Sequence, residues 1–295
     1  MKGSRAFSTH VVRPPSAVLV RPVTPRASSS TLHAEDRRSP RPTTEPAPDP
    51  QPQRLLAMPG RRPPRWPKER DWLVMETIDD LIRTHQEPAD FQPIAWNRDN
   101  WQQLWDAAPA IPALEVLDLI DAEVQGAGQG TIRRSWIRGL ADGDDALVFL
   151  AASTIWGYGN YVRFGRPALR AMLSTPDAPS ITRDIIERSR LSPAAGFSAL
   201  FADGRPRIAH LSIAFGTKVV HFAGYDVAAP KPLILDKRVY RSAQRLGVDA
   251  VPDPEGFVTG VQYEGYCTWA AEVAASHGVE PAIVEYALFA TGSSR

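Results

Sequence analysis

The chain has 295 residues, with 28 prolines, one cysteine and a formal net charge of +1. Its hydrophobic fraction of 43% allows a sizeable core and excludes collagen, coiled-coil and fully disordered proteins. The lone Cys267 excludes a disulfide framework and a cysteine-cluster zinc site, and the six histidines show no metal-ligand spacing, so we expect neither a metal nor a cofactor.

Residues 1–66 form a basic, proline-rich segment that we expect to be disordered. Residues 1–67 hold 12 Lys and Arg against 4 Asp and Glu, together with 14 of the 28 prolines. Proline has no backbone donor, and few apolar side chains are present to offset the entropy of ordering. The prolines also argue against the amphipathic helix of an organelle transit peptide. We therefore expect a solvated basic tail with weak affinity for DNA.

Residues 67–295 carry mainly helical patterns and form the expected folded domain. No run of 18 apolar residues occurs, which predicts no membrane-spanning helix. Apolar side chains recur at three- and four-residue spacing from Trp72 to Ile82 and from Leu114 to Val124. Similar patterns predict helices over 131–140, 146–156, 166–174, 182–189, 193–202, 206–212, 217–225, 237–246, 260–277 and 281–290. Because strand alternation is nowhere sustained, the expected fold class is all-α, a bundle of short helices.

The segment from Pro206 to Arg245 carries the most chemical information. Its pattern predicts a helix, a tight turn over 213–218 and a second helix. Gly216 would allow a close backbone approach in the turn, and the free N–H groups of the helix start after it would bind an anion such as a DNA phosphate. Lys218 would lie in that first turn, where the positive helix end lowers the pKa of its amine.

An extended apolar run follows, and it leads to Asp236 at the start of a third helix. A carboxylate at a helix start accepts backbone N–H bonds and stays ionised. This pattern resembles the helix-hairpin-helix DNA glycosylases, in particular the 8-oxoguanine DNA glycosylase (OGG-fold) type. The matching residues are Gly216-Thr217-Lys218 and Pro232-Leu233-Ile234-Leu235-Asp236. The family hairpin usually holds two glycines, and Ala214 stands at the first of these positions.

The resemblance implies a helix-hairpin-helix near 206–225 and an enzyme that flips a modified base out of double-stranded DNA. Lys218 would be the nucleophile and Asp236 the catalytic carboxylate. A neutral lysine forms a Schiff base with the deoxyribose, which adds abasic-site (AP) lyase activity to base excision. The default substrate is 8-oxoguanine. The alternatives are a glycosylase for a bulky hypermodified base of the phage type, a non-catalytic DNA-binding module, and an unrelated all-α protein with a basic patch.

Further site residues are assigned by their position relative to this motif. We expect DNA contacts from Phe215, Gly216, Thr217, Asn160, Arg238 and Arg241, and base-pocket walls from Phe222, Trp156, Tyr158 and Trp269. Taken alone, a lysine at such a position is usually only solvated, and an aromatic residue usually packs in the core. The glycosylase hypothesis therefore depends on the order of the hairpin, Lys218, the apolar run and Asp236 along the chain. We expect the protein to be a monomer. Because a single cysteine suits a reducing compartment, we expect it in the cytoplasm, associated with the nucleoid.

Overall fold

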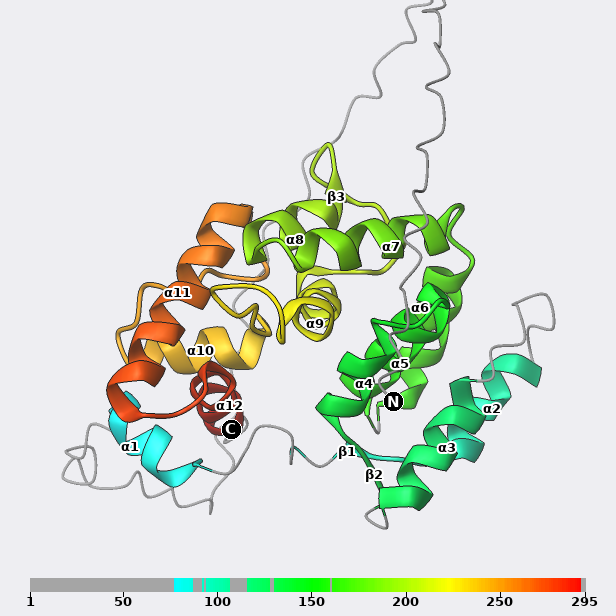
Figure 1. Ribbon diagram of the computed structural model, residues 1–295, viewed down its shortest axis with the longest axis horizontal. Helices are drawn as coiled ribbons and strands as arrows, with labels where there is room; N and C mark the ends of the chain where they lie inside the picture. Colours follow the sequence, from blue (N-terminus) through cyan, green and yellow to red (C-terminus); the bar gives the residue numbers. More distant parts are fainter. Residues whose placement is uncertain are drawn as a thin grey trace, which may run out of the picture. The chain divides into compact units, whose positions relative to one another are not determined.

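The computed structural model describes residues 77–86, 92, 94–106, 116–127, 130–159 and 161–292. The chain divides into two units, Met1–Arg65 and Trp66–Arg295, and all described residues belong to the second (Figure 1). Four expectations fall outside the described residues: the disordered tail 1–66, the starts of the predicted helices at Trp72 and Leu114, and the DNA contact of Asn160.

Twelve helices and four two-residue strands make up the described part of the chain, which confirms the all-α class. The first eight elements are α1 (Ile78–Thr84), β1 (Ile94–Ala95), α2 (Arg98–Asp106), α3 (Val116–Ala127), β2 (Thr131–Ile132), α4 (Arg134–Leu140), α5 (Ala146–Tyr158) and α6 (Val162–Leu173). The remaining eight are α7 (Ala178–Ser189), α8 (Pro193–Ala199), β3 (Phe201–Ala202), β4 (Arg205–Pro206), α9 (Ile213–Gly224), α10 (Lys237–Arg245), α11 (Gly260–His277) and α12 (Pro281–Thr291). Strand β1 pairs with β2 and β3 with β4, both antiparallel.

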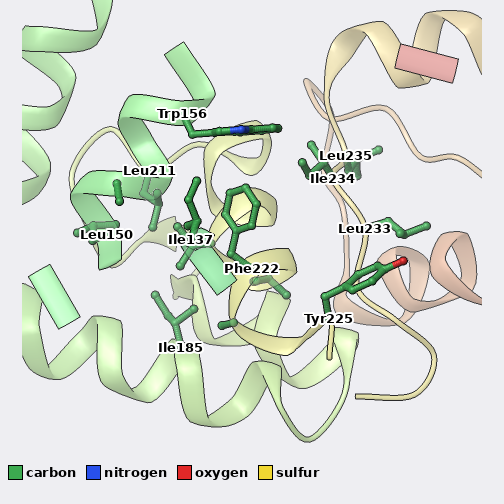
Figure 2. Packing of buried hydrophobic residues seen from close by; sticks show 14 of the residues in the cluster. Ile137, Leu150, Trp156, Ile185, Leu211, Phe222, Tyr225, Leu233, Ile234 and Leu235 are labelled. Atoms are coloured by element: carbon green, nitrogen blue, oxygen red, sulfur yellow. The ribbon is translucent and has the colours of Figure 1, made fainter. Parts of the chain in front are cut away.

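Helix α5 is the central helix of the core. Its side chains are apolar on nearly all sides, as expected of a helix that is surrounded by other elements. It packs against α3, α4, α6, α7 and α9. Asp145 begins it by accepting the backbone N–H bonds of Leu147 and Val148 at 2.9 and 3.1 Å. Trp156 of α5 meets Phe222 of α9 edge to face, with ring centroids 5.1 Å apart (Figure 2).

An extended segment that is buried over residues 232–235 leads from α9 to α10. Its backbone has no strand partner, so side chains of neighbouring helices supply the hydrogen bonds that buried peptide groups require. The bonds are Tyr263 Oη to the Leu233 carbonyl at 2.5 Å, Tyr266 Oη to the Ile234 carbonyl at 3.2 Å, and the Leu235 N–H to Thr217 Oγ1 at 3.0 Å. They fix the position at which Asp236 begins α10, next to the side of α9.

The predicted hairpin differs from the observed chain path. The helix expected over 206–212 is wrong: β4 ends at Pro206, and His210 has a φ of 62°, outside the helical region. Helix α9 begins at Ile213, not at 217, because the extended Ser212 accepts the N–H bonds of Phe215 and Gly216 with its carbonyl. Gly216 therefore lies inside a helix, and the tight turn over 213–218 does not exist.

Three other differences from the local predictions concern α5, α2 and the strands. The helix predicted over 146–156 extends to Tyr158, and α5 ends at Gly159 with a φ of 50°. Helix α2 was not predicted, because Trp101 is the only one of its described side chains that is buried. The two strand pairs were also missed, since two-residue strands are too short to show alternation.

Candidate active site

A cavity of about 710 Å³ lies among α5, α9, α10 and α12, within the usual range for ligand sites. Both residues of the proposed catalytic pair, Lys218 and Asp236, line it. The described lining residues are Gln92, Ile94, Ala95, Arg134, Trp156, Gly157, Tyr158, Gly159, Tyr161, Ala214, Phe215, Lys218, Ile234, Asp236, Lys237, Arg238, Glu285, Tyr286, Phe289 and Ala290.

Lys218 is in the second turn of α9 and is only 7% exposed. Its Nζ donates to the Ala214 carbonyl at 2.9 Å, lies 5.0 Å from the centre of the Phe215 ring, and is 4.0 Å from Asp236 Oδ2. Burial lowers the pKa of the amine, while the charges of Asp236 and Glu285 act in the opposite direction. The pKa is thus lowered as the sequence suggested, but the cause is desolvation rather than the start of a helix.

Asp236 divides its two carboxylate oxygens between two tasks. Oδ1 accepts the N–H bonds of Arg238 and Val239 at 2.9 and 3.1 Å and so caps α10. Oδ2 is the atom nearest to Lys218 Nζ. The side chain is 14% exposed, so the carboxylate remains accessible from the cavity.

A buried ion pair that no sequence pattern predicted lies in the wall of the same cavity. Arg134 donates to both carboxylate oxygens of Glu285, at 2.8 and 3.2 Å, and to the amide oxygen of Gln92. Arg134 and Glu285 are each 1% exposed. They are 151 residues apart in sequence, on α4 and α12, so no local pattern could have connected them.

Two of the four expected base-pocket aromatic residues line the cavity. Trp156 lies under the guanidinium of Arg134, 5.0 Å from the ring centre, and its Nε1 has no hydrogen-bond partner. Tyr158 stacks on Phe215 with ring centroids 4.2 Å apart. Phe222 is behind Trp156 in the core, and Trp269 stacks against Tyr266 of α11; neither is in the cavity wall. Tyr286 and Phe289 of α12 are additional aromatic walls.

The expected DNA contacts are divided between buried and accessible positions. Gly216 and Thr217 are buried in α9, and Thr217 Oγ1 is bonded to the Leu235 backbone, so neither is available to DNA. Phe215 is half-buried and lines the cavity. Arg238 also lines it, with its guanidinium over the Phe289 ring at 4.7 Å, and Arg241 is exposed one turn further along α10.

Residues 87–289 match the model of the family described as "Putative 8-oxoguanine DNA glycosylase OGG-like protein". The chain belongs to this OGG-like family. The match covers more than half of the chain, and Arg134, Lys218, Asp236 and Glu285 all lie within it. At the coarse level the protein is therefore a DNA glycosylase, with DNA as its partner. Searches of curated proteins and of solved structures found no match.

Two further observations concern the described part of this OGG-like protein. None of its helices combines the length and the apolar composition needed to cross a membrane. No group of three or more His, Cys, Asp or Glu side chains is gathered there in an arrangement that would hold a metal ion. The ionisable groups that line the cavity are two amines, two carboxylates, two guanidinium groups and three phenols, those of Lys218, Lys237, Asp236, Glu285, Arg134, Arg238, Tyr158, Tyr161 and Tyr286.

Proposed function

We propose that this protein excises an oxidised or otherwise modified base from double-stranded DNA, 8-oxoguanine being the first candidate, and then cleaves the abasic strand through a Schiff base on Lys218. The observation that carries the proposal is the pair itself. An amine with a lowered pKa lies 4.0 Å from a carboxylate in a cavity with aromatic walls. Membership of the OGG-like glycosylase family supports the same chemistry.

Base release requires stabilisation of positive charge on the deoxyribose. A base inside a duplex is out of reach, so the enzyme flips it into the cavity at a cost of a few kcal/mol. As the N-glycosidic bond breaks, its electron pair leaves with the base and C1′ becomes cationic. The Asp236 carboxylate is fixed beside Lys218 by its capping bonds and needs no reorganisation to stabilise that cation.

Strand cleavage requires the amine to act as a nucleophile. The neutral Lys218 Nζ forms a bond with C1′ in place of the bond to the departing base and gives up a proton. The C1′–O4′ bond then breaks, O4′ takes up a proton, and C1′ becomes the carbon of the imine. The imine acidifies the C2′ proton, whose removal expels the 3′ phosphate by β-elimination. Burial lowers the pKa of this amine and so raises its neutral fraction near pH 7. A charged lysine has no lone pair and would be inert.

The experiment is to trap the Schiff base with borohydride on duplex DNA that holds one abasic site. Wild-type protein should give a covalent adduct, and Lys218→Gln should give none. Lys231→Gln is the matched control, because Lys231 is a lysine of the same unit whose Nζ pairs with Glu280 at 3.3 Å outside the cavity. An adduct with Lys218→Gln would refute the assignment of the nucleophile, and DNA binding without a wild-type adduct would indicate a non-catalytic module.

The substrate is identified by a panel of duplexes that carry one modified base each. Release of 8-oxoguanine should be fastest if the default holds. Faster release of a bulky hypermodified base would instead indicate the phage-type variant, which a cavity of about 710 Å³ has room for. We further propose that the enzyme acts as a monomer in the cytoplasm, associated with the nucleoid; gel filtration and localisation of a tagged chain test these two points.

A further inference from the structure

Helix α6 carries a ridge of three arginines that the proposed catalytic mechanism does not use. Arg163, Arg166 and Arg170 are spaced i, i+3 and i+7, so their side chains share one face of the helix. The helix contains no Asp or Glu. These three residues line a groove of about 510 Å³ together with Gln103, Pro167, Ala171 and Ser174.

The charge of this ridge is not neutralised within the described part of the chain. None of the three arginines has a carboxylate within 4.0 Å there; Arg166 donates only to the amide oxygen of Gln103. Most other described arginines are paired with acids, among them Arg83 with Asp80, Arg98 with Asp118 and Asp121, Arg133 with Glu123, Arg138 with Asp226, Arg188 and Arg207 with Asp184, and Arg190 with Asp142. An unneutralised row of guanidinium groups on an exposed helix is an anion-binding surface.

The spacing of the ridge suits a row of phosphates. Arg163 and Arg170 are seven residues apart, which is about 10 Å along a helix that rises 1.5 Å per residue. One strand of duplex DNA carries a phosphate about every 3.4 Å of its axis, so a helix of this length lying parallel to that axis would face about three phosphates. Arginine also recognises phosphate in a bidentate manner, which favours a nucleic acid over an acidic protein as the partner.

The position of α6 indicates which DNA strand it contacts. Tyr161, which precedes the helix and is 70% exposed, lines the catalytic cavity, so α6 begins at the rim of that cavity. Helix α6 packs on α5, and Figure 1 places it on the other side of α9 from α10 and α12. The damaged strand must pass Lys218 of α9 and Asp236 of α10. A duplex held in this way would carry its partner strand toward α6.

We propose that Arg163, Arg166 and Arg170 bind phosphates of the DNA strand opposite the flipped base. This inference rests on the proposed DNA glycosylase function and adds a second contact surface to it. Its consequence is a preference for duplex over single-stranded DNA, because only a duplex supplies the second backbone.

The experiment compares duplex and single-stranded oligonucleotides that carry the same abasic site. The triple variant Arg163→Gln/Arg166→Gln/Arg170→Gln should bind the duplex at least tenfold more weakly at 0.1 M salt. The slope of log K against log salt is negative, and it should become less steep by about 2 to 3. This corresponds to about 0.9 for each of the three phosphate contacts that are lost. Affinity for the single strand should change less than twofold, and borohydride trapping at saturating duplex should persist.

The control triple variant is Arg83→Gln/Arg98→Gln/Arg188→Gln. It changes the net charge equally, but it removes arginines that carboxylates already neutralise. Should the first triple variant fold poorly, the double variant Arg163→Gln/Arg170→Gln keeps the Arg166–Gln103 bond and should show about two thirds of the slope change.

Two results would overturn the inference. If the triple variant lost equal affinity for duplex and single-stranded DNA, the ridge would contact the damaged strand. If its loss of affinity were no larger than that of the control variant, DNA would not be the ligand of the ridge. A failure of the proposed function would give a different result: the wild-type protein, with its three α6 arginines intact, would form no borohydride adduct with any abasic DNA.

Discussion

Replacing Arg134 with methionine should destabilise the protein by about 3–5 kcal/mol at pH 7, the cost of leaving a buried charge without its partner. Glu285 is 1% exposed, and Arg134 supplies two hydrogen bonds to its carboxylate, at 2.8 and 3.2 Å. The guanidinium also lies 5.0 Å from the centre of the Trp156 ring, and loss of this contact adds about 1–2 kcal/mol. Methionine refills the volume without replacing either interaction.

The measurement is thermal unfolding of four proteins: wild type, Arg134→Met, Glu285→Met and the double variant. For a folded unit of this size 1 kcal/mol shifts Tm by roughly 2–4 °C, so the combined loss of about 4–7 kcal/mol should make Arg134→Met melt roughly 8–28 °C below wild type. The double variant should be no less stable than either single variant, because two apolar side chains leave no uncompensated charge. The reasoning would be refuted if the losses in unfolding free energy of the two single variants added up in the double variant. It would also be refuted if either single variant lost less than about 1 kcal/mol.

The same variants should shift the catalytic pH profile in opposite directions. The positive charge of Arg134 lowers the pKa of Lys218, and the negative charge of Glu285 raises it. Removing Arg134 alone should therefore raise the pKa of the amine, and half-maximal borohydride trapping should move to higher pH. Glu285→Met should move it to lower pH. A shift in the same direction for both variants would contradict an electrostatic origin.

Three further predictions concern single positions. Asp236→Asn removes a charge that raises the pKa of Lys218, so trapping on preformed abasic DNA should become half-maximal at lower pH while base excision is lost; assays of trapping and excision across pH separate the two effects. Gly157→Ala should slow borohydride trapping severalfold in a single-turnover assay without weakening DNA binding, because the new Cβ would lie 2.8 Å from both Lys218 Cδ and Phe215 Cε1. Gly126→Ala is the control, because a Cβ at that position meets open space. Cys267 is buried and its thiol has a pKa raised to about 12, so a thiol reagent should modify it only on unfolding, which mass spectrometry detects; rapid labelling of folded protein would be the opposite result.

Part of this fold and site could be predicted from local patterns. Helices α10, α11 and α12 fall close to their expected bounds because each begins with a strong local signal: the Asp236 cap, the Thr259–Gln262 capping box and Pro281 at the first turn. Lys218 and Asp236 were selected together from sequence order, and the structure places them 4.0 Å apart. This proximity is what the motif required.

Other parts depend on contacts that no local pattern contains. The start of α9 was misplaced because Gly216 suggests a turn, whereas its missing Cβ serves close packing: a Cβ there would lie 2.6 Å from the Leu200 side chain. Thr217 resembled a phosphate contact but bonds the Leu235 backbone instead. Arg134 and Glu285 carry no motif at all, and only the folded chain brings them into the cavity wall.

The two carboxylate oxygens of Asp236 make different contacts, so the residue that caps α10 can also act as the proposed catalytic carboxylate. Oδ1 is occupied by two N–H groups of α10, so the side chain cannot rotate away, and Oδ2 stays directed at Lys218. Asparagine caps helices as well as aspartate does, so Asp236→Asn should keep the cap and lose only the charge. A stability close to that of wild type, measured with a loss of base excision, would thus assign the loss to electrostatics at C1′. A large drop in Tm would show instead that the ionised carboxylate is needed to hold α10 against α9.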